Sequence, residues 1–404
     1  MPRLLDWITR PRSRYPWLQG LIRCGYAGLR LTVPTNPLQI AFESVPDCTE
    51  SPYAMFSRIM RSPNAERYRL IWLVKNLDDA AAVVTDEFGY IPDNVSLVKK
   101  ISLQGFWTFL RSRYVFFSHR TYWFARSVFH QRVVNLWHGM PIKELGGIEK
   151  SSGIWRLSGI YSVATSPLFA DIIASAFVLR PERVLVSGLP RNEWLFESSD
   201  PRHLALRNGA ERLVVWFPTF RRAAVGDSTQ DDMTDNNHDP ITAEQLIRLD
   251  ASLKGSCVRV LVKLHPLDIK NAQAWPDLSN VIVVNNDVMK ERGFNTYRIL
   301  AQADALVTDC SSAAIDFLLL RRPIAFYMPD EEEYVRGFTS SVHRRLPEIG
   351  RKLRSFEDLV QFITNSEEVV DSNRTEVFHN PHLRESTVCI LRAVGLEELA
   401  LRQE

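Results

Sequence analysis

The sequence contains no hydrophobic run long enough to cross a membrane. No stretch approaches the roughly 18 consecutive apolar residues of a transmembrane helix. The N-terminus lacks a continuous apolar segment with a small-residue cleavage site, so we expect no secretory signal peptide. The five cysteines are odd in number, scattered and without a CxxC pair, which argues against a disulfide framework or a zinc site. These absences favour a cytoplasmic chain with reduced thiols.

Motifs of several cofactor-dependent classes are also missing. There is no P-loop, no HExxH, no EF-hand spacing and no GxGxxG after an expected strand. The sequence contains no DxD motif, which would have indicated an obligatory metal. We therefore expect no required cofactor, although Mg²⁺ could accompany a diphosphate substrate. The formal net charge of +2 gives no reason to expect a nucleic-acid partner.

What is present is the composition of a folded protein with a basic N-terminus. The 404 residues are 45% hydrophobic and 24% charged, and this length suits two domains. Residues 1–42 carry six arginines against one acidic residue, interleaved with aromatic and aliphatic side chains. This pattern is typical of an amphipathic segment on a membrane surface, but an arm that packs on its own domain has the same composition. We predict a membrane-associating segment at 1–40 and domains at 41–190 and 191–404.

Short β-type runs alternate with helix-length stretches, which predicts βαβ units, parallel sheets and an α/β fold. Two helix starts are marked. A capping-box pattern begins at Thr242, and apolar residues at helical spacing follow Ser311 until Pro323. The expected strands are 70–74, 114–118, 133–137, 184–187, 213–217, 258–264, 281–284, 305–308 and 323–327.

Two of these strands lead into a histidine, one in each half of the chain. His138 follows the first, and His265 follows the second, with Lys263 just before it. Ligands of open α/β sheets bind at the carboxyl ends of strands. A lone histidine after a strand is more often structural than catalytic, but its repetition favours a cleft between two domains.

Five segments end apolar runs with polar or turn-forming residues, namely 137–141, 187–192, 217–221, 263–266 and 308–316. Together they supply imidazoles, an ammonium, guanidinium groups, hydroxyls and carboxylates, an inventory that suits a phosphate-bearing ligand. Ser311 and Ser312 stand where a helix should begin. They form either an anion site or an ordinary helix cap.

The same segments resemble one family. WHGMP, GLPRN, FPTFR, KLHP and TDCSSAAIDFLLLRRPIAFYMPD, together with FES at 42–44, are similar to motifs of the CDP-glycerol glycerophosphotransferase family, which builds teichoic acids and capsular polymers. The resemblance covers about 42–334. It implies a GT-B type architecture, with two Rossmann-like domains facing a central cleft. It also implies transfer of glycerol phosphate from CDP-glycerol to an acceptor hydroxyl, with release of CMP.

The resemblance further implies which residues bind the substrates. Two positions depart from the family pattern: Met140 replaces a usual threonine, and Cys310 replaces a usual tyrosine. The threonine hydroxyl lost at Met140 is worth about 0.5 to 1.5 kcal/mol as a hydrogen bond to the donor. The implied donor contacts are Trp137, His138, Gly139, Met140, Pro141, Arg191, Pro218 and Thr219. The implied contacts to the diphosphate are Lys263, Leu264 and His265. The nucleotide pocket would be completed by Ser311, Ser312 and Asp316.

We expect His138 to act as the general base that deprotonates the acceptor hydroxyl, because imidazole is well suited to this task near neutral pH. His265 could share or hold that role. Phosphoryl transfer otherwise needs positioning and charge stabilisation. Lys263, Arg191 and the helix start at Ser311 would stabilise the diphosphate and the departing CMP.

The expected partners follow from the resemblance as well. The family's acceptors are carried on undecaprenyl lipid, which implies a lipid-linked or polymer acceptor and a chain held peripherally at the inner face of the cell membrane by its N-terminal arm. The length favours a primase, with a capsule polymerase or a ribitol-phosphate transferase as alternatives. Two other classes remain: a GT-B nucleotide-sugar glycosyltransferase and a non-catalytic, membrane-associated assembly protein.

Overall fold

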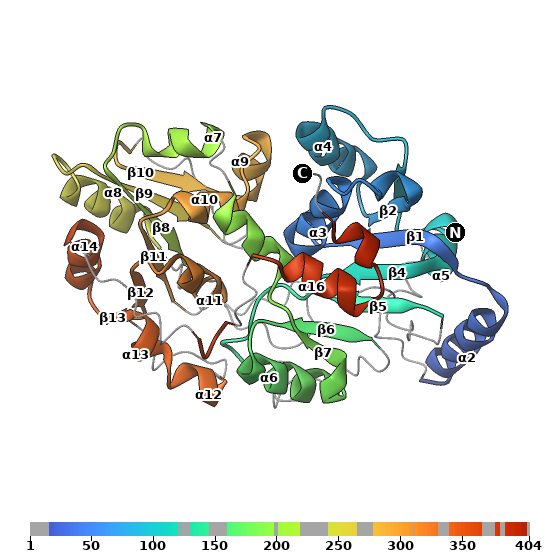
Figure 1. Cartoon of the computed structure of the whole chain (residues 1–404). Coiled ribbons are helices and arrows are strands. Elements are labelled where there is room, and N and C mark those ends of the chain that lie inside the picture. Colours follow the sequence, from blue (N-terminus) through green and yellow to red (C-terminus); the bar gives the residue numbers. More distant parts are fainter. Residues whose placement is uncertain are drawn as a thin grey trace. The chain divides into compact units, whose positions relative to one another are not determined.

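The computed structural model describes most of the chain as two compact units (Figure 1). Unit 1 comprises 1–138, 155–193 and 380–404, and unit 2 comprises 139–154 and 194–379. Side chains at 16–20, 22 and 23 are not described. The described residues are 16–119, 122, 130–144, 160–197, 201–218, 241–264, 278–309, 311–329, 339–365, 376–379 and 384–401.

Unit 1 is built on a parallel sheet of seven strands in the order β3-β2-β1-β4-β5-β6-β7. Its central strands are apolar on both faces, as expected of a parallel sheet covered on two sides. Its strands are β1 (Asn36–Glu43), β2 (Arg69–Val74), β3 (Val95–Lys99), β4 (Ser112–Phe117), β5 (Arg132–Asn135), β6 (Tyr161–Ala164) and β7 (Val184–Val186).

Alternate side chains of β1 meet helices on opposite faces of this sheet, because successive strand residues point to opposite sides. Phe42 stacks between Trp72 and Phe116 of the neighbouring strands and also contacts Phe56 on α3. Ala41, on the other face, belongs to a buried cluster with residues of α5. The helices of unit 1 are α2 (Pro16–Thr32), α3 (Glu50–Met60), α4 (Leu77–Phe88), α5 (Leu103–Arg111), α6 (Pro167–Phe177) and α16 (Ser386–Ala393), and its short 3₁₀ turns are η1 (Ala65–Arg67), η3 (Pro181–Arg183) and η9 (Glu397–Leu399).

Side-chain caps fix where several of these helices begin. Asn76 accepts hydrogen bonds from two backbone N–H groups of α4. Ser102 and Ser166 cap α5 and α6 in the same way, and Pro167 opens α6. Helix starts are thereby placed directly after β2, β3 and β6, where each strand leaves the sheet.

Helix α2 packs on unit 1 through one face only. Tyr26 and Arg30 are buried, and the Arg30 guanidinium donates to the carbonyl of Leu110 on α5 at 2.6 Å. Leu21 and Leu31, on the rest of the helix, are strongly exposed. The described part of this segment therefore packs on its own unit through one face, and its association with a membrane stays a prediction.

Unit 2 is built on a second parallel sheet, of six strands in the order β10-β9-β8-β11-β12-β13. The capping box predicted at Thr242 is present: its hydroxyl accepts from the N–H of Gln245, whose side chain accepts from the N–H of Thr242. The strands are β8 (Arg212–Phe217), β9 (Val258–Lys263), β10 (Val281–Val284), β11 (Ala305–Thr308), β12 (Ile324–Tyr327) and β13 (Arg351–Leu353).

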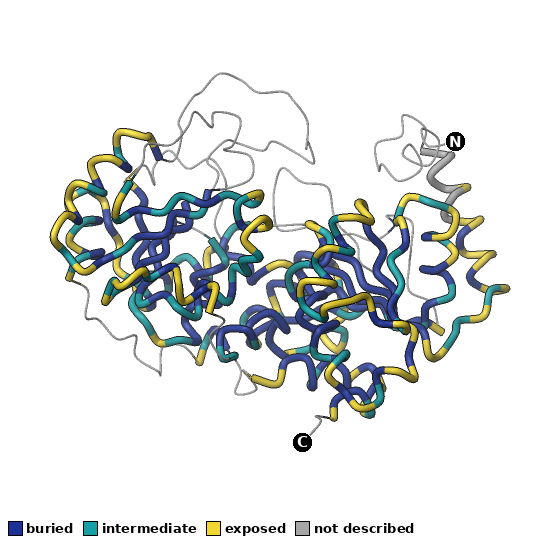
Figure 2. Tube along the Cα trace, turned by 90° about the horizontal axis from the view of Figure 1, so that it is seen from above, coloured by how far each residue is buried: buried dark blue, intermediate teal, exposed yellow. Residues whose placement is uncertain are grey.

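One face of the second sheet packs against α8 and α14 in a continuous apolar cluster. Figure 2 shows the backbone trace with its buried residues gathered in the interior and its exposed residues along outer segments. The helices of unit 2 are α7 (Pro201–Leu204), α8 (Ala243–Ser252), α9 (Asn286–Glu291), α10 (Thr296–Gln302), α11 (Ala313–Phe317), α12 (Ser340–His343), α13 (Leu346–Ile349) and α14 (Phe356–Asn365), with 3₁₀ turns η5 (Ala205–Arg207) and η7 (Leu318–Leu320), and η4 (Pro190–Phe196) spans the change from unit 1 to unit 2.

Both sheets have the doubly wound strand order in which the chain starts at a central strand and then reverses direction across the sheet. The reversal lies between β1 and β4 in unit 1 and between β8 and β11 in unit 2. The predicted α/β class and the parallel sheets are confirmed. Ligands of such sheets bind beyond the carboxyl ends of the strands at this point of reversal, which directs attention to the residues after these strands.

The C-terminal residues 380–404 belong to unit 1, whereas the sequence-based boundaries placed all of 191–404 in one domain. Glu398 explains the difference. Its carboxylate pairs with Arg67 and accepts from the Tyr68 hydroxyl, while its carbonyl accepts from Asn64 at 2.9 Å. These partners lie between α3 and β2, so the end of the chain returns to the first sheet.

Candidate active site

The reversal point of unit 1 gathers polar residues from three neighbouring strands. Glu43 ends β1, Ser118 and His119 follow β4, and His138 follows β5. The strands are parallel and adjacent, so their carboxyl ends lie along one edge of the sheet. This edge carries the candidate catalytic residues of unit 1.

A sharp turn after β5 presents His138. The Asn135 side chain accepts from the N–H of Trp137 at 3.0 Å, and Trp137 adopts a left-handed conformation with φ of 50°. Gly139 follows with φ of 133°, which L-residues avoid. The Trp137 ring is buried edge-on against Phe177, whereas His138 is exposed. The turn therefore anchors the indole and keeps His138 at the surface.

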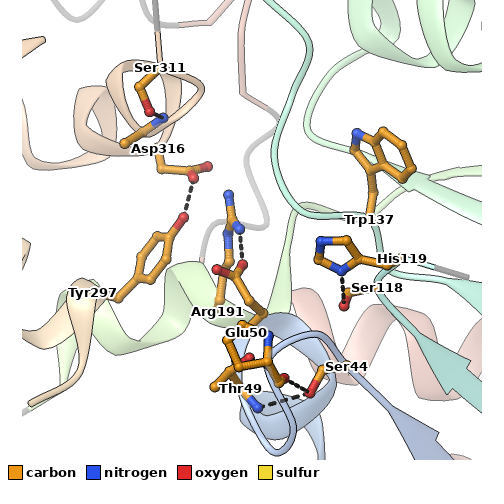
Figure 3. Close-up of polar contacts among 12 residues, drawn as sticks. Ser44, Thr49, Glu50, Ser118, His119, Trp137, Arg191, Tyr297, Ser311 and Asp316 are labelled. Carbon is orange, nitrogen blue, oxygen red and sulfur yellow. Dashed lines mark hydrogen bonds and ion pairs between the residues drawn. The ribbon is translucent and has the colours of Figure 1, made fainter. Parts of the chain in front are cut away.

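A second histidine lies against the first. The rings of His119 and His138 are stacked, with centroids 4.5 Å apart and an interplanar angle of 18°. The Trp137 ring also contacts His138, at 4.0 Å between centroids. The hydroxyl of Ser118 is 2.9 Å from Nδ1 of His119 and fixes that ring (Figure 3). His119 was not among the residues predicted from sequence, although it directly follows the expected strand 114–118.

Charged groups around His119 act in both directions on its pKa. Burial lowers the pKa most, the nearby Glu50 carboxylate raises it, and the Arg191 and Lys100 cations lower it further. Lys100 is itself paired with Glu43. Burial raises the pKa of Glu43, and the Lys100 ammonium opposes that shift. The net effect keeps the His119 ring neutral near pH 7.

Arg191, which the sequence resemblance assigned to the donor, is almost fully buried and forms an ion pair with Glu50 at the start of α3 (Figure 3). The Ser44 hydroxyl stabilises the loop before α3 through two hydrogen bonds to its backbone. Ser44 accepts from the N–H of Thr49 at 3.0 Å and donates to the carbonyl of Pro46 at 2.8 Å. Arg191 therefore stabilises the carboxyl edge of unit 1, and its contact with a donor remains a prediction.

The reversal point of unit 2 contains the other group of predicted residues. Pro218 follows β8 and is buried, and the Thr308 hydroxyl at the end of β11 donates to the carbonyl of Phe217 at 2.7 Å. Ser311 accepts from the N–H of Ala313 at 3.3 Å. Ser312 immediately precedes α11 but makes no capping hydrogen bond through its side chain. The expected helix after Ser311 is thus present, in a short form that continues as the 3₁₀ turn η7.

Asp316 on α11 is fully buried and accepts from the Tyr297 hydroxyl at 2.6 Å (Figure 3). His379 is also buried and lies 2.6 Å, through Nε2, from the carbonyl of Ile315. Burial lowers the pKa of His379, while this carbonyl and the Asp316 carboxylate raise it. A network of buried polar groups thus underlies the segment that carries Ser311, and Asp316 belongs to it.

The remaining predicted residues are distributed between the two units. Leu264 packs in the apolar cluster of unit 2 and its N–H donates to the carbonyl of Val284. Its own carbonyl can only accept a hydrogen bond, so it offers no donor to a diphosphate, and the predicted contact stays a prediction. Thr219, His265 and Cys310 lie outside the described residues. Gly139, Met140 and Pro141 are buried. Of the predicted residues, unit 1 contains Trp137, His138 and Arg191, and unit 2 contains Gly139, Met140, Pro141, Pro218, Lys263, Leu264, Ser311, Ser312 and Asp316.

The His, Cys, Asp and Glu side chains of the described residues form no group of three or more that could hold a metal ion. Within the same part of the chain, no helix combines the length and hydropathy needed to span a bilayer.

Residues 26–382 match the model of a protein family described as CDP-Glycerol:Poly(glycerophosphate) glycerophosphotransferase. Among curated relatives, the chain is 26% identical over 232 residues to a teichoic acid ribitol-phosphate primase from Bacillus spizizenii, covering 55% of this chain and 54% of the relative. It is 25% identical over 345 residues to a teichoic acid poly(glycerol phosphate) polymerase from Staphylococcus epidermidis, covering 77% and 43%. The chain thus spans about half the length of these relatives.

A third relative is matched over more of its length. The chain is 24% identical over 331 residues to a teichoic acid glycerol-phosphate transferase from Staphylococcus aureus, covering 74% of this chain and 76% of the relative.

The fold has counterparts among solved structures. A wall teichoic acid polymerase, TagF, in a variant soaked with CDPG superposes with a TM-score of 0.71 at 19% identity, covering 95% of this chain and 97% of that chain. A protein described as a putative UDP-N-acetylglucosamine 2-epimerase from Listeria monocytogenes gives 0.51 at 13% identity, covering 92% and 99%. At these identities the likeness concerns the fold alone.

Proposed function

The chain belongs to the CDP-glycerol:poly(glycerophosphate) glycerophosphotransferase family, and from this premise we propose that it transfers glycerol phosphate from CDP-glycerol to an acceptor hydroxyl in teichoic acid or capsular polymer synthesis. The acceptor oxygen forms a bond to the glycerol-bearing phosphorus. The bond from that phosphorus to the bridging oxygen breaks, and CMP leaves with this oxygen. The acceptor proton passes to a base on the protein.

His138 is the base in this proposal. The single observation that supports it most is the turn after β5, which buries Trp137 and leaves the adjacent imidazole exposed beside the reversal point of the sheet. A side chain held in place before the substrate arrives needs little reorganisation during proton transfer. His265 would share the acid–base work or bind the diphosphate.

The donor is assigned to the carboxyl edge of unit 2. Lys263 ends β9, and Ser311 and Ser312 lie just after β11, so an ammonium and two hydroxyls stand at the carboxyl ends of these strands, where phosphate oxygens would be bound. In this proposal the buried pair of Asp316 and Tyr297 stabilises the segment that carries Ser311 and Ser312 and does not itself contact the donor. The protein's task is to neutralise the charge that moves onto CMP as it departs.

The test is nucleotide release from three donors in the presence of a lipid-linked acceptor analogue: CMP from CDP-glycerol, CMP from CDP-ribitol and a nucleoside diphosphate from a nucleotide sugar. We expect acceptor-dependent release of CMP from CDP-glycerol and a new phosphodiester in the product. The ribitol alternative has a specific observation in its favour, because one matched relative is a ribitol-phosphate primase. A nucleoside diphosphate released from the nucleotide sugar, with CDP-glycerol unchanged, would replace the proposal with glycosyl transfer.

Peripheral association with the inner face of the membrane is a second part of the proposal. On α2, Tyr26 and Arg30 face unit 1, and the exposed residues from 24 to 32 are all uncharged. An uncharged helix face preceded by a segment rich in arginine suits the boundary between anionic headgroups and acyl chains.

Three leucines on this helix, Leu21, Leu29 and Leu31, are exposed by 60%, 43% and 85%. Replacing all three by Gln should weaken binding to anionic vesicles at least about tenfold, since each buried leucine contributes on the order of 1.5 kcal/mol or more. The matched control replaces three exposed leucines elsewhere by Gln. Equal co-sedimentation of both triple variants would exclude this face of α2 as the membrane contact. The control leucines are Leu77, Leu204 and Leu401.

A further inference from the structure

The stack of His119 on His138 has a geometry that the proposed reaction can use. The two rings are within 18° of parallel at 4.5 Å, and they come from the ends of neighbouring strands β4 and β5. Rings packed in this way restrict each other's rotation. A base whose ring cannot turn freely keeps its proton-accepting nitrogen in one direction.

His119 is itself held by a hydrogen bond at the edge of its ring. The Ser118 hydroxyl lies 2.9 Å from its Nδ1, and Ser118 is fully buried at the end of β4. The ring is therefore held by a buried residue that directly follows β4 and whose own N–H donates to the carbonyl of Glu43 at the end of β1, at 3.2 Å. His119 can transmit this rigidity to His138 through the ring contact.

The groups that face His119 favour its neutral form. Lys100 after β3 and Arg191 on η4 are cations, Glu50 on α3 is the opposing anion, and Glu50 is already engaged by Arg191. Burial adds to the effect of the cations and lowers the pKa of His119. Two imidazolium rings at this separation would repel each other strongly, so a neutral His119 is the condition under which His138 can accept a proton.

We propose that His119 is a positioning residue for the transfer: its neutral ring orients His138 and stabilises the imidazolium that forms when His138 takes the acceptor's proton. An aromatic face attracts a cation placed over it, and the attraction grows when water is excluded. The proton stays on His138 until CMP departs and is then returned to solvent. This inference rests on the proposed function, because it assigns His119 a part in the same step.

The test compares two substitutions at one position. His119→Gln removes the ring, whereas His119→Phe keeps a flat aromatic face without a titratable group. With His119→Gln we expect the acid limb of the pH profile of CMP release to move to lower pH by about half a unit to one unit, because the imidazolium loses its stacking partner. We expect kcat to fall roughly 10- to 100-fold with KM nearly unchanged.

His119→Phe should restore the acid limb and most of kcat, and Ser118→Ala should give a smaller change in the direction of His119→Gln. The control is His130→Gln, the same substitution on an exposed residue at the opposite end of β5. Its carbonyl, and not its ring, accepts the bonds from Thr35 and Arg113. Equal loss of activity in the Gln and Phe variants would overturn the stacking role, as would an acid limb that does not move.

A measurement without substrate separates this inference from the proposed function. Titration of histidine ring signals by NMR, with His138 assigned from its own substitution, follows its midpoint in the wild type and in both His119 variants. A midpoint that falls with His119→Gln and returns with His119→Phe supports the inference even if no donor is turned over. If the wild type releases CMP but the His138 midpoint is the same in the wild type and in His119→Gln, the inference is wrong and the proposed function stands.

Discussion

Replacing Glu50 by Gln should destabilise unit 1 by a measurable amount, because it removes the charge that neutralises a buried guanidinium. The Arg191 side chain is 3% exposed and that of Glu50 is 30% exposed. Removing one partner of a buried ion pair costs about 3 to 5 kcal/mol. The partial exposure of Glu50 places this pair at the lower end, at about 3 kcal/mol.

The expected change in melting temperature follows from the size of the unit. Unit 1 has roughly 200 residues, and for 150 to 250 residues a loss of 1 kcal/mol lowers Tm by about 2 to 4 °C. We therefore expect the unit 1 transition in calorimetry to fall by about 6 to 12 °C. The control is Glu357→Gln, since Glu357 pairs with Arg248 at 2.5 Å while both side chains are more than half exposed. That variant should shift Tm by no more than about 2 °C.

A double variant identifies the physical cause. If the cost comes from an uncompensated buried cation, Glu50→Gln with Arg191→Met should be more stable than Glu50→Gln alone, because the cation is then absent. A Tm of Glu50→Gln within 2 °C of the wild type, or a double variant that is less stable than the single one, would refute the reasoning.

Three further predictions concern unit 2. Tyr297→Phe removes the donor to the buried Asp316 carboxylate and should cost about 1.5 to 3 kcal/mol in urea unfolding; a loss below about 0.5 kcal/mol would contradict a structural role. Burial lowers the pKa of His379 below its unfolded value of 6.5, so its neutral form stabilises the fold above that pH and this stability is lost as pH falls. Between pH 7.5 and 5, Tm should therefore fall more in the wild type than in His379→Gln, and parallel curves would refute this. Thr242→Ala breaks the capping box with Gln245 and should cost about 1 kcal/mol, whereas an unchanged Tm would show that the cap contributes nothing.

The sequence predicted the strands that combine apolar character with clear flanking turns. All nine expected strands are present, and seven of them lie within a residue of their observed bounds, the exceptions being those expected at 114–118 and 133–137. Four others were missed, β1, β3, β6 and β13. Two reasons are visible: β1 contains Pro37 and Gln39, and β13 is a three-residue edge strand with two exposed charged residues. In both, pairing with neighbouring strands overrides the local pattern.

The site was predictable only where one segment carried the signal. His138 stood out because it follows a buried strand, and His119 carried the same signal but stood alone, without a motif around it. The pairing of Glu50 with Arg191 joins residues 141 positions apart, and nothing in either segment indicates the other. The burial of Leu264 and Asp316 likewise depends on tertiary packing, which residue type alone does not reveal.

The central claim is that the exposed imidazole of His138 accepts the acceptor's proton during transfer from CDP-glycerol. The most direct measurement is the initial rate of acceptor-dependent CMP release by the wild type and by His138→Ala, with donor affinity measured in parallel. We predict a rate lower by about 10²- to 10⁴-fold with similar donor affinity and an unchanged circular dichroism spectrum. CMP release by the folded variant at a rate near that of the wild type would contradict the account.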